Sequence, residues 1–265
     1  KTMGGGLMQL VAYGAQDIYL TGNPQITFFK VVYRRHTNFS MESIRQTITG
    51  SENTEATSNK GEVLVSRNGD LIHNIYVTVK EPGNSIVKKG SKIINEVEFE
   101  IGGQLIDKHT SEWMETWNEL STSASKAVGL KSMQRCLGNN VYGSKIIQVP
   151  LQFWFCRNPG LALPLIALQY HEVRLKFKWG TIAEHEGTSL KCNVWVEYIY
   201  LDTDERRRFA QVSHEYLIEQ VQIQEYIDGT TVHKLQFNHP VKELIWTSQE
   251  KNTYATAQLK LNGHD

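Results

Sequence analysis

Apolar and polar residues alternate along most of the first 200 positions, which is the pattern of half-buried β-strands. Val97, Phe99 and Ile101 alternate with three glutamates, and Gly102 and Gly103 follow them directly. This order predicts a β-hairpin closed by the two glycines. On the same grounds we expect strands at 41–49, 62–67, 71–80, 95–101, 104–109, 146–155, 170–180 and 193–202.

Helix and turn signals interrupt this pattern. We expect a helix at 111–122 with Ser111 as its N-cap, because Trp113, Trp117 and Leu120 recur there at helical spacing. Asn68-Gly69 predicts a tight hairpin between the strands at 62–67 and 71–80. Weakly patterned or polar stretches predict surface loops at 50–61, 121–143 and 181–190.

About eight antiparallel strands with a single helical insertion favour an all-β fold. Antiparallel strands in this number bury one face each, and two packed sheets are the natural solution. Strands and helices do not alternate regularly, which argues against a doubly wound parallel sheet. The expected fold is a jelly-roll β-sandwich with short helical insertions.

The alternation of apolar and polar residues stops after Leu201, which predicts a domain boundary there. Residues 202–211 suit a short linker helix capped by Thr203 or Asp204. Alternation then resumes at 216–226, with Leu217, Glu219, Val221 and Ile223 on one face, and further strands are expected at 231–237, 242–247 and 256–263. The second β domain is expected to be incomplete, because about fifty residues are too few to close a sandwich. We therefore expect four parts in the chain. They are an N-terminal segment 1–36, a first sandwich 37–202, a linker helix 203–213 and the start of a second sandwich 214–265.

Charge and composition exclude several functional classes. The 28 basic residues balance 28 acidic ones, whereas proteins that wrap nucleic acid usually carry a basic excess. Three scattered cysteines argue against a disulfide framework. No apolar run reaches the length of about 18 residues that a membrane-spanning helix needs. We expect no cofactor and no metal.

Candidate chemistry is sparse, and each candidate has a structural interpretation that we favour. Asp107, His109 and Glu112 could form an acid–base or metal group, but a polar turn with a helix cap is expected. The acidic and histidine residues at 184–186 suit a solvated loop. Trp113 and Trp117 could stack on sugars or bases, although packing against the sandwich is favoured.

Two further features are polar. The arginines of the linker, within Asp204, Glu205, Arg206, Arg207, Arg208 and Phe209, could clamp phosphate, but local ion pairs with neighbouring acids are favoured. Asn38-Phe39-Ser40 is a formal glycosylation sequon, expected to be unused without a secretory signal.

The segment ITFFKVVYRRHTNF at 26–39 is too short in its apolar part to span a bilayer. We expect a strand or tight turn that closes one end of the sandwich, with two arginines facing a partner or an acidic neighbour. The residues of this candidate inner-face or interface segment are Phe28, Phe29, Tyr33, Arg34, Arg35 and His36.

Three blocks of the sequence resemble one protein family. GNPQITFFKVVYRRHTNF, YIYLDTDERRRFAQVSHEYLIEQ and the NHPVKELIW…LKLNGHD region are similar to the major capsid proteins of nucleocytoplasmic large DNA viruses, which include iridovirus, phycodnavirus, mimivirus and marseillevirus-like groups. The resemblance implies a double jelly roll whose homotrimers form pseudo-hexameric capsomers that tile an icosahedral shell. It further implies minor capsid and penton proteins as partners, an inner viral membrane near segment 1–36, and no direct contact with nucleic acid. It places the protein in the virion, assembled in the host cytoplasm.

Three classes of function remain open from the sequence. A structural capsid protein without catalysis is the leading hypothesis. The alternatives are a jelly-roll carbohydrate-binding module that uses Trp113 or Trp117, and an enzyme on a jelly-roll frame with a histidine–carboxylate cluster inside the barrel.

Overall fold

The computed structural model describes most of the chain in seven stretches. These are residues 37–54, 59–80, 90–134, 146–180, 189–225, 232–247 and 256–260. The segment 1–36, with the candidate residues Phe28 to His36, and the acidic loop at 184–186 lie outside them. The chain divides into two compact units, one up to Val221 and one from Gln222 onward.

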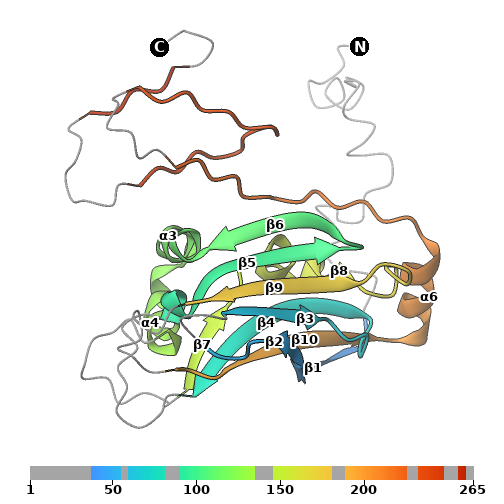
Figure 1. The fold of residues 1–265 in the computed structure, drawn as a ribbon. Coiled ribbons are helices and arrows are strands. Elements are labelled where there is room, and N and C mark those ends of the chain that lie inside the picture. Colours follow the sequence, from blue (N-terminus) through green and yellow to red (C-terminus); the bar gives the residue numbers. More distant parts are fainter. Residues whose placement is uncertain are drawn as a thin grey trace, which may run out of the picture. The chain divides into compact units, whose positions relative to one another are not determined.

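The first unit is a sandwich of two antiparallel sheets (Figure 1). The first sheet has the order β1-β10-β4-β7, with β8 paired to β4, and the second has the order β2-β3-β9-β5-β6. The first sheet consists of β1 (Phe39–Gln46), β4 (Leu71–Lys80), β7 (Ile146–Pro150), β8 (Leu163–Pro164) and β10 (Cys192–Leu201). The second consists of β2 (Ile48–Gly50), β3 (Lys60–Leu64), β5 (Ile94–Ile101), β6 (Gln104–Thr110) and β9 (Val173–Trp179). The chain crosses repeatedly between the sheets, as in a jelly roll, which confirms the predicted fold class.

Helices lie at the two ends of this sandwich (Figure 1). The helices α3 and α4 lie at one end, and α6 lies at the other. Their bounds are α3 (Ser111–Ser121), α4 (Ala124–Met133), α5 (Trp154–Arg157) and α6 (Thr203–Gln211), with 3₁₀ turns η1 (Gly90–Ile93) and η2 (Pro159–Leu161). The sequence predicted a loop where α4 forms. The helix α4 has no buried residue, so its sequence shows no apolar stripe at helical spacing.

Aromatic side chains fill the space between the sheets. Phe99, Phe153 and Phe155 form a mutual cluster with ring centroids 5.0–5.9 Å apart. Trp179 stacks on Phe177 at 4.6 Å, and its Nε1 donates a hydrogen bond of 2.8 Å to the carbonyl of Ser51. The predicted inward faces of the 95–101, 170–180 and 193–202 strands all contribute to this core.

The predicted hairpin at Gly102 and Gly103 is confirmed, and the one at Asn68-Gly69 is wrong. Gly102 and Gly103 have φ values of +59° and +82°, as a two-residue hairpin turn requires. The strands on either side of Gly69 belong to different sheets, so the chain crosses there instead of turning back. A Cβ at Gly69 would lie 2.7 Å from the Cβ of Tyr198, so the glycine permits a close crossing.

The expected strand at 41–49 also divides between the sheets. The strand β1 pairs with β10, and β2, which starts two residues later, pairs with β3 in the other sheet. Gln46 lies at the break with 3% of its surface exposed, and its Oε1 accepts hydrogen bonds from Ser66 N and Oγ at 3.0 and 2.9 Å. The buried amide of Gln46 thus has hydrogen-bond partners at the point where the backbone passes from the first sheet to the second.

The helix α3 forms as predicted but begins and faces differently. Its N-cap is Thr110 instead of Ser111, with Thr110 Oγ1 accepting from Trp113 N at 3.3 Å. Its buried stripe contains Met114 and Asn118, while Leu120 is 60% exposed. Trp113 and Trp117 are half-buried at the margin of the core.

The strands predicted for the second unit are absent from its described residues. These residues run as extended chain, and none of them is buried. Gln224 exchanges two hydrogen bonds with the backbone of Gln236, at 2.6 and 3.0 Å, which brings the two segments together. Strand pairing needs a hydrophobic face to bury, and the described residues of this unit bury none.

We expect Gly69→Ala to destabilise the sandwich by about 1–3 kcal/mol, because the added methyl group would overlap Tyr198 across the sheet crossing. Gly129→Ala is the matched control, since it lies in α4 with open space around it and should gain about 0.5–1 kcal/mol. Chemical denaturation of both variants measures the difference. Equal stabilities would contradict the close crossing at Gly69.

Candidate functional site

The segment that leads out of the first sandwich is the feature that the sequence could not place. It consists of α6 and of residues 212–221, which follow this helix. Residues 212–221 are here called the strap. Asp202 caps α6, since its Oδ1 accepts a hydrogen bond of 2.7 Å from Thr203 N. The predicted cap was Thr203 or Asp204, so the helix begins one residue earlier than expected.

Asp70 anchors the beginning of this segment. One of its carboxylate oxygens accepts from Leu201 N at 2.8 Å, and Arg206 contacts both oxygens at 2.9 and 3.1 Å. The prediction of local ion pairs is therefore wrong for Arg206, whose partner lies 136 positions away. Phe209 adds an apolar contact by packing on a small cluster that includes Leu71 and Ile199.

The first half of the strap is held by aromatic contacts. The ring of His214 stacks on Phe209 at 5.1 Å. Tyr216 lies 5.5 Å from the ring of Trp154 and donates a 3.2 Å hydrogen bond to the carbonyl of Ala162. Tyr216 and Ile218 pack on the main core, whereas Leu217 is 92% exposed. Leu217 and its two neighbours thus face opposite ways, as successive residues of an extended segment do.

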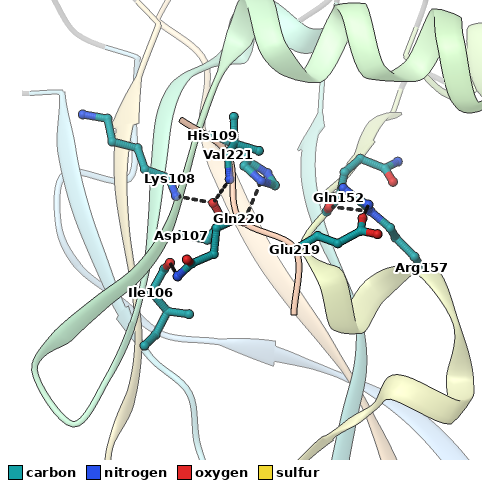
Figure 2. Close-up of polar contacts among 9 residues, drawn as sticks. All are labelled: Ile106, Asp107, Lys108, His109, Gln152, Arg157, Glu219, Gln220 and Val221. Atoms are coloured by element: carbon teal, nitrogen blue, oxygen red, sulfur yellow. Dashed lines mark hydrogen bonds and ion pairs between the residues drawn. The ribbon is translucent and has the colours of Figure 1, made fainter. Parts of the chain in front are cut away.

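The second half of the strap runs along β6, an edge strand of the second sheet (Figure 2). Glu219 forms an ion pair with Arg157, whose guanidinium lies 4.4 Å from the centre of the Trp117 ring. Gln220 Nε2 donates to the carbonyl of Ile106 at 2.5 Å. The strap therefore covers backbone groups that an open sheet edge would leave exposed.

Asp107 holds the end of the strap. Its Oδ1 accepts from Val221 N at 3.0 Å and from Lys108 N at 2.9 Å (Figure 2). Its Oδ2 lies 2.9 Å from His109 Nε2, and both side chains are only 1% exposed. The imidazole of His109 stacks on Phe153 at 4.6 Å. A buried carboxylate with this set of donors serves as a structural anchor.

The candidate catalytic groups do not converge. Glu112 lies apart from Asp107 and His109, pairs with Lys92 at 3.0 Å, and has a side chain that is 69% exposed. No set of three or more metal-ligating side chains occurs in the described residues. None of the helices that the structure describes has the length and apolarity to cross a bilayer.

The aromatic pair on α3 is covered by protein. Trp113 and Trp117 stack on each other at 5.5 Å, and Arg157 lies over Trp117. Both rings are half-buried and neither belongs to the main core cluster, so they pack on each other and on Arg157 instead of entering the core as the sequence favoured. Asn38, the residue of the sequon, is exposed immediately before β1.

Sequence reasoning missed both anchors for the same reason. Asp70 follows a turn-like tripeptide, and Asp107 stands in a strand among other polar residues. Each accepts a backbone N–H from a segment more than a hundred positions away. The one available signal was at Asp107, an aspartate within a predicted strand, because a carboxylate buried there demands a partner.

We expect Asp107→Ala to free the end of the strap, because Val221 N loses its acceptor and His109 loses its carboxylate. A hydrogen bond to a charged group contributes roughly 1.5–3 kcal/mol, so the Val221 amide should exchange about 10- to 100-fold faster with deuterium. Glu219→Gln is the control, because its partly exposed pair with Arg157 contributes less than about 1 kcal/mol. Unchanged exchange at Val221 in the alanine variant would contradict the anchor.

We expect Cys156 and Cys192 to resist alkylation in the folded protein. Burial raises the pKa of each thiol to about 12, so the reactive thiolate is scarce at neutral pH. At pH 8 both should react roughly a thousandfold more slowly than free cysteine, whose pKa is about 8.5. Mass-spectrometric mapping after iodoacetamide treatment, with and without denaturant, checks this. Rapid labelling of either site in the folded protein would contradict it.

Two protein families match the sequence of this chain. Residues 27–202 match the family described as the major capsid protein N-terminus, and residues 205–262 match the large eukaryotic DNA virus major capsid protein family. The two matches meet at the start of α6.

Relatives of the chain have the same family assignment. The chain is 55% identical over 289 residues to the major capsid protein of Pyramimonas orientalis virus, covering 99% of the chain and 72% of the relative. It is 46% identical to that of Paramecium bursaria Chlorella virus 1, covering 95% and 62%.

A quasi-atomic model of the PBCV-1 virus capsid superposes with a TM-score of 0.64 at 45% identity, covering 74% of the chain and 50% of that structure. The chain thus spans about half the length of this solved structure. On these matches, and as the resemblance predicted, the chain belongs to the major capsid protein family of the large eukaryotic DNA viruses.

Proposed function

We propose that the chain is a structural subunit of a viral capsid. Three copies close into a pseudo-hexameric capsomer, and capsomers tile an icosahedral shell. The observation that carries this proposal is the jelly-roll sandwich itself, together with its 45% identity to a protein solved as a virus capsid. Such a protein acts through shape and side-to-side contact, for which a rigid two-sheet sandwich is suited.

The linker gives this subunit a defined exit from its first sandwich. Asp70 holds the chain at Leu201, just before α6, and Asp107 holds it at Val221, the last residue of the strap. In the double jelly roll that we propose, residues 204–209 form the interdomain linker and the second unit begins a second jelly roll. Fixing the exit of the chain limits the positions open to that second domain.

The other partners and locations follow from the same proposal. The residues Phe28 to His36 form an inner-face or interface segment near minor capsid and penton proteins and an inner viral membrane. The subunit makes no direct contact with nucleic acid, which is consistent with its balanced charge. It resides in the virion after assembly in the host cytoplasm, and Asn38 carries no glycan unless a viral enzyme modifies it.

Neither alternative class gains support. The comparisons with known proteins give the carbohydrate-binding module no support, and Arg157 covers Trp117, where a sugar would stack. An enzyme would need a histidine–carboxylate group open to substrate, whereas the side chains of Asp107 and His109 are only 1% exposed. We propose that the subunit has no catalytic activity.

We expect the purified full-length protein to form a trimer, and native mass spectrometry should give three times the mass of the chain. The reason is that obligate capsid subunits bury extensive surface against their neighbours. Ionic strength provides a control, since an interface driven by apolar burial should persist in high salt. A protein that stays monomeric at every concentration and salt level would contradict the proposal.

A further inference from the structure

The Asn68-Gly69 pair, which predicted a hairpin, lies instead where the chain crosses from the second sheet to the first. The strand β3 ends at Leu64 and β4 begins at Leu71, so the pair belongs to neither strand. The side chain of Asn68 is exposed. An asparagine before a glycine also has a chemistry of its own, because the backbone nitrogen of the glycine can attack the side-chain amide of the asparagine.

The crossing requires the glycine that makes this attack easy. A Cβ at Gly69 would lie 2.7 Å from the Cβ and 3.2 Å from the Cδ1 of Tyr198, so a side chain at position 69 has no room. A side chain there would also crowd the backbone nitrogen and hinder its approach to the neighbouring amide, whereas glycine has none. The packing against Tyr198 therefore retains the residue that hinders the reaction least.

Both reacting groups are free of hydrogen bonds. Across the described ranges, no hydrogen bond engages the side chain of Asn68 or the backbone N–H of Gly69. The next amide along the chain is engaged, since Asp70 N donates to the carbonyl of Ile199 at 3.0 Å. An unbonded side-chain amide rotates freely, and an unbonded N–H loses its proton without breaking a hydrogen bond.

We propose that Asn68 is a site of spontaneous deamidation, with water as the co-reactant. The Gly69 nitrogen gives up its proton and bonds to Cγ of Asn68, and the Cγ–Nδ2 bond breaks as ammonia leaves. Water then opens the resulting succinimide at one of its two carbonyl carbons. Opening at Cγ gives aspartate, and opening at the backbone carbonyl carbon gives isoaspartate. The inference goes beyond the proposed capsid function and does not depend on it.

The isoaspartate product changes the backbone at a place where both flanks are fixed. The carbonyl of Ser66 accepts a hydrogen bond of 2.6 Å from Tyr198 Oη, and Asp70 N is bonded to Ile199. Both flanks of Asn68 are thus tied to neighbouring residues of β10. Isoaspartate routes the chain through its side chain and adds one methylene group between these two fixed points, so the crossing must distort.

The distortion falls on the anchor of the linker. Asp70 lies two positions after the modified residue, and its carboxylate accepts from Leu201 N at 2.8 Å and contacts Arg206. A shift of the Asp70 backbone moves this carboxylate away from both partners. Deamidation at Asn68 therefore loosens the start of α6, in addition to placing a new charge on the surface.

The reaction is tested by incubating the purified protein in heavy-oxygen water at mildly alkaline pH and mapping its peptides by mass spectrometry. We expect the amide of Asn68 to be replaced by a labelled carboxylate at least about tenfold faster than that of Asn74, a difference of about 1.4 kcal/mol in activation free energy. Asn74 is the matched control, because its Nδ2 donates to Glu197 at 2.6 Å and the β-branched Ile75 follows it within β4.

Two features of the labelling separate this reaction from alternatives. The heavy oxygen marks deamidation in the folded protein, whereas deamidation during digestion in ordinary water adds no label. The rate at Asn68 should rise with pH, because the Gly69 nitrogen must lose its proton. An unlabelled Asn68, or labelling no faster than at Asn74, would overturn the proposal.

The consequence for the linker has its own test. A protein isoaspartate methyltransferase with S-adenosylmethionine should methylate the aged wild-type protein but not Asn68→Ser aged in parallel, since serine cannot form the succinimide. In the aged wild type the Leu201 amide should exchange about tenfold faster with deuterium, as loss of a hydrogen bond to a charged group implies. Freshly prepared Asn68→Asp carries the new charge without the added methylene group and should exchange as the unaged protein does. Isoaspartate formation without faster exchange at Leu201, or equally fast exchange in Asn68→Asp, would overturn the effect of the added methylene group on the Asp70 anchor.

Discussion

Burial of two apolar sheet faces against each other is the constraint on which the rest of this structure depends. Neither sheet can bury its inner face alone, so strands from early and late parts of the chain must meet in both. The aromatic cluster around Phe99 and the Trp179–Phe177 stack show how completely the space is filled. Local departures, such as Gly69 and Gln46, occur where the backbone must pass from one sheet to the other.

Packing two sheets face to face does not cover the edge strands, and it does not fix the path by which the chain leaves the sandwich. The edge at β6 is covered by the strap, whose groups bond to Ile106 and Asp107. The two anchoring carboxylates act by accepting backbone N–H groups, which fixes the path of the chain whatever its side chains are. A domain that must present a second domain to neighbours benefits from such a path, because disorder at the junction would cost conformational entropy on assembly.

The outer faces of the two sheets differ in chemistry. Inner faces must be apolar for folding, but outer faces are free to differ, and here they do. One carries a network of paired charges and the other a row containing Trp195 and Tyr76.

Much of this architecture could be predicted from periodicity and turn chemistry. The strands around Val97, Val173 and Val194, their inward faces and the Gly102-Gly103 turn all follow from local pattern, because alternation reports which side of a strand is buried. The helix α6 followed from its cap and charge order, although its first residue did not. In contrast, α4 has no buried face, and the described residues of the second unit have the alternation of strands but do not form them.

By itself the sequence determined the class of fold, the membership of the family and the absence of the charge excess that genome wrapping needs. Only the tertiary structure decided which sheet each strand joins, that Asp70 and Asp107 hold the linker, and which outer face carries the network of paired charges. Alternation records the environment of a residue but not the identity of its partner. The Asp70–Arg206 and Asp107–Val221 contacts join residues 136 and 114 positions apart, and such pairings exist only once the core has formed.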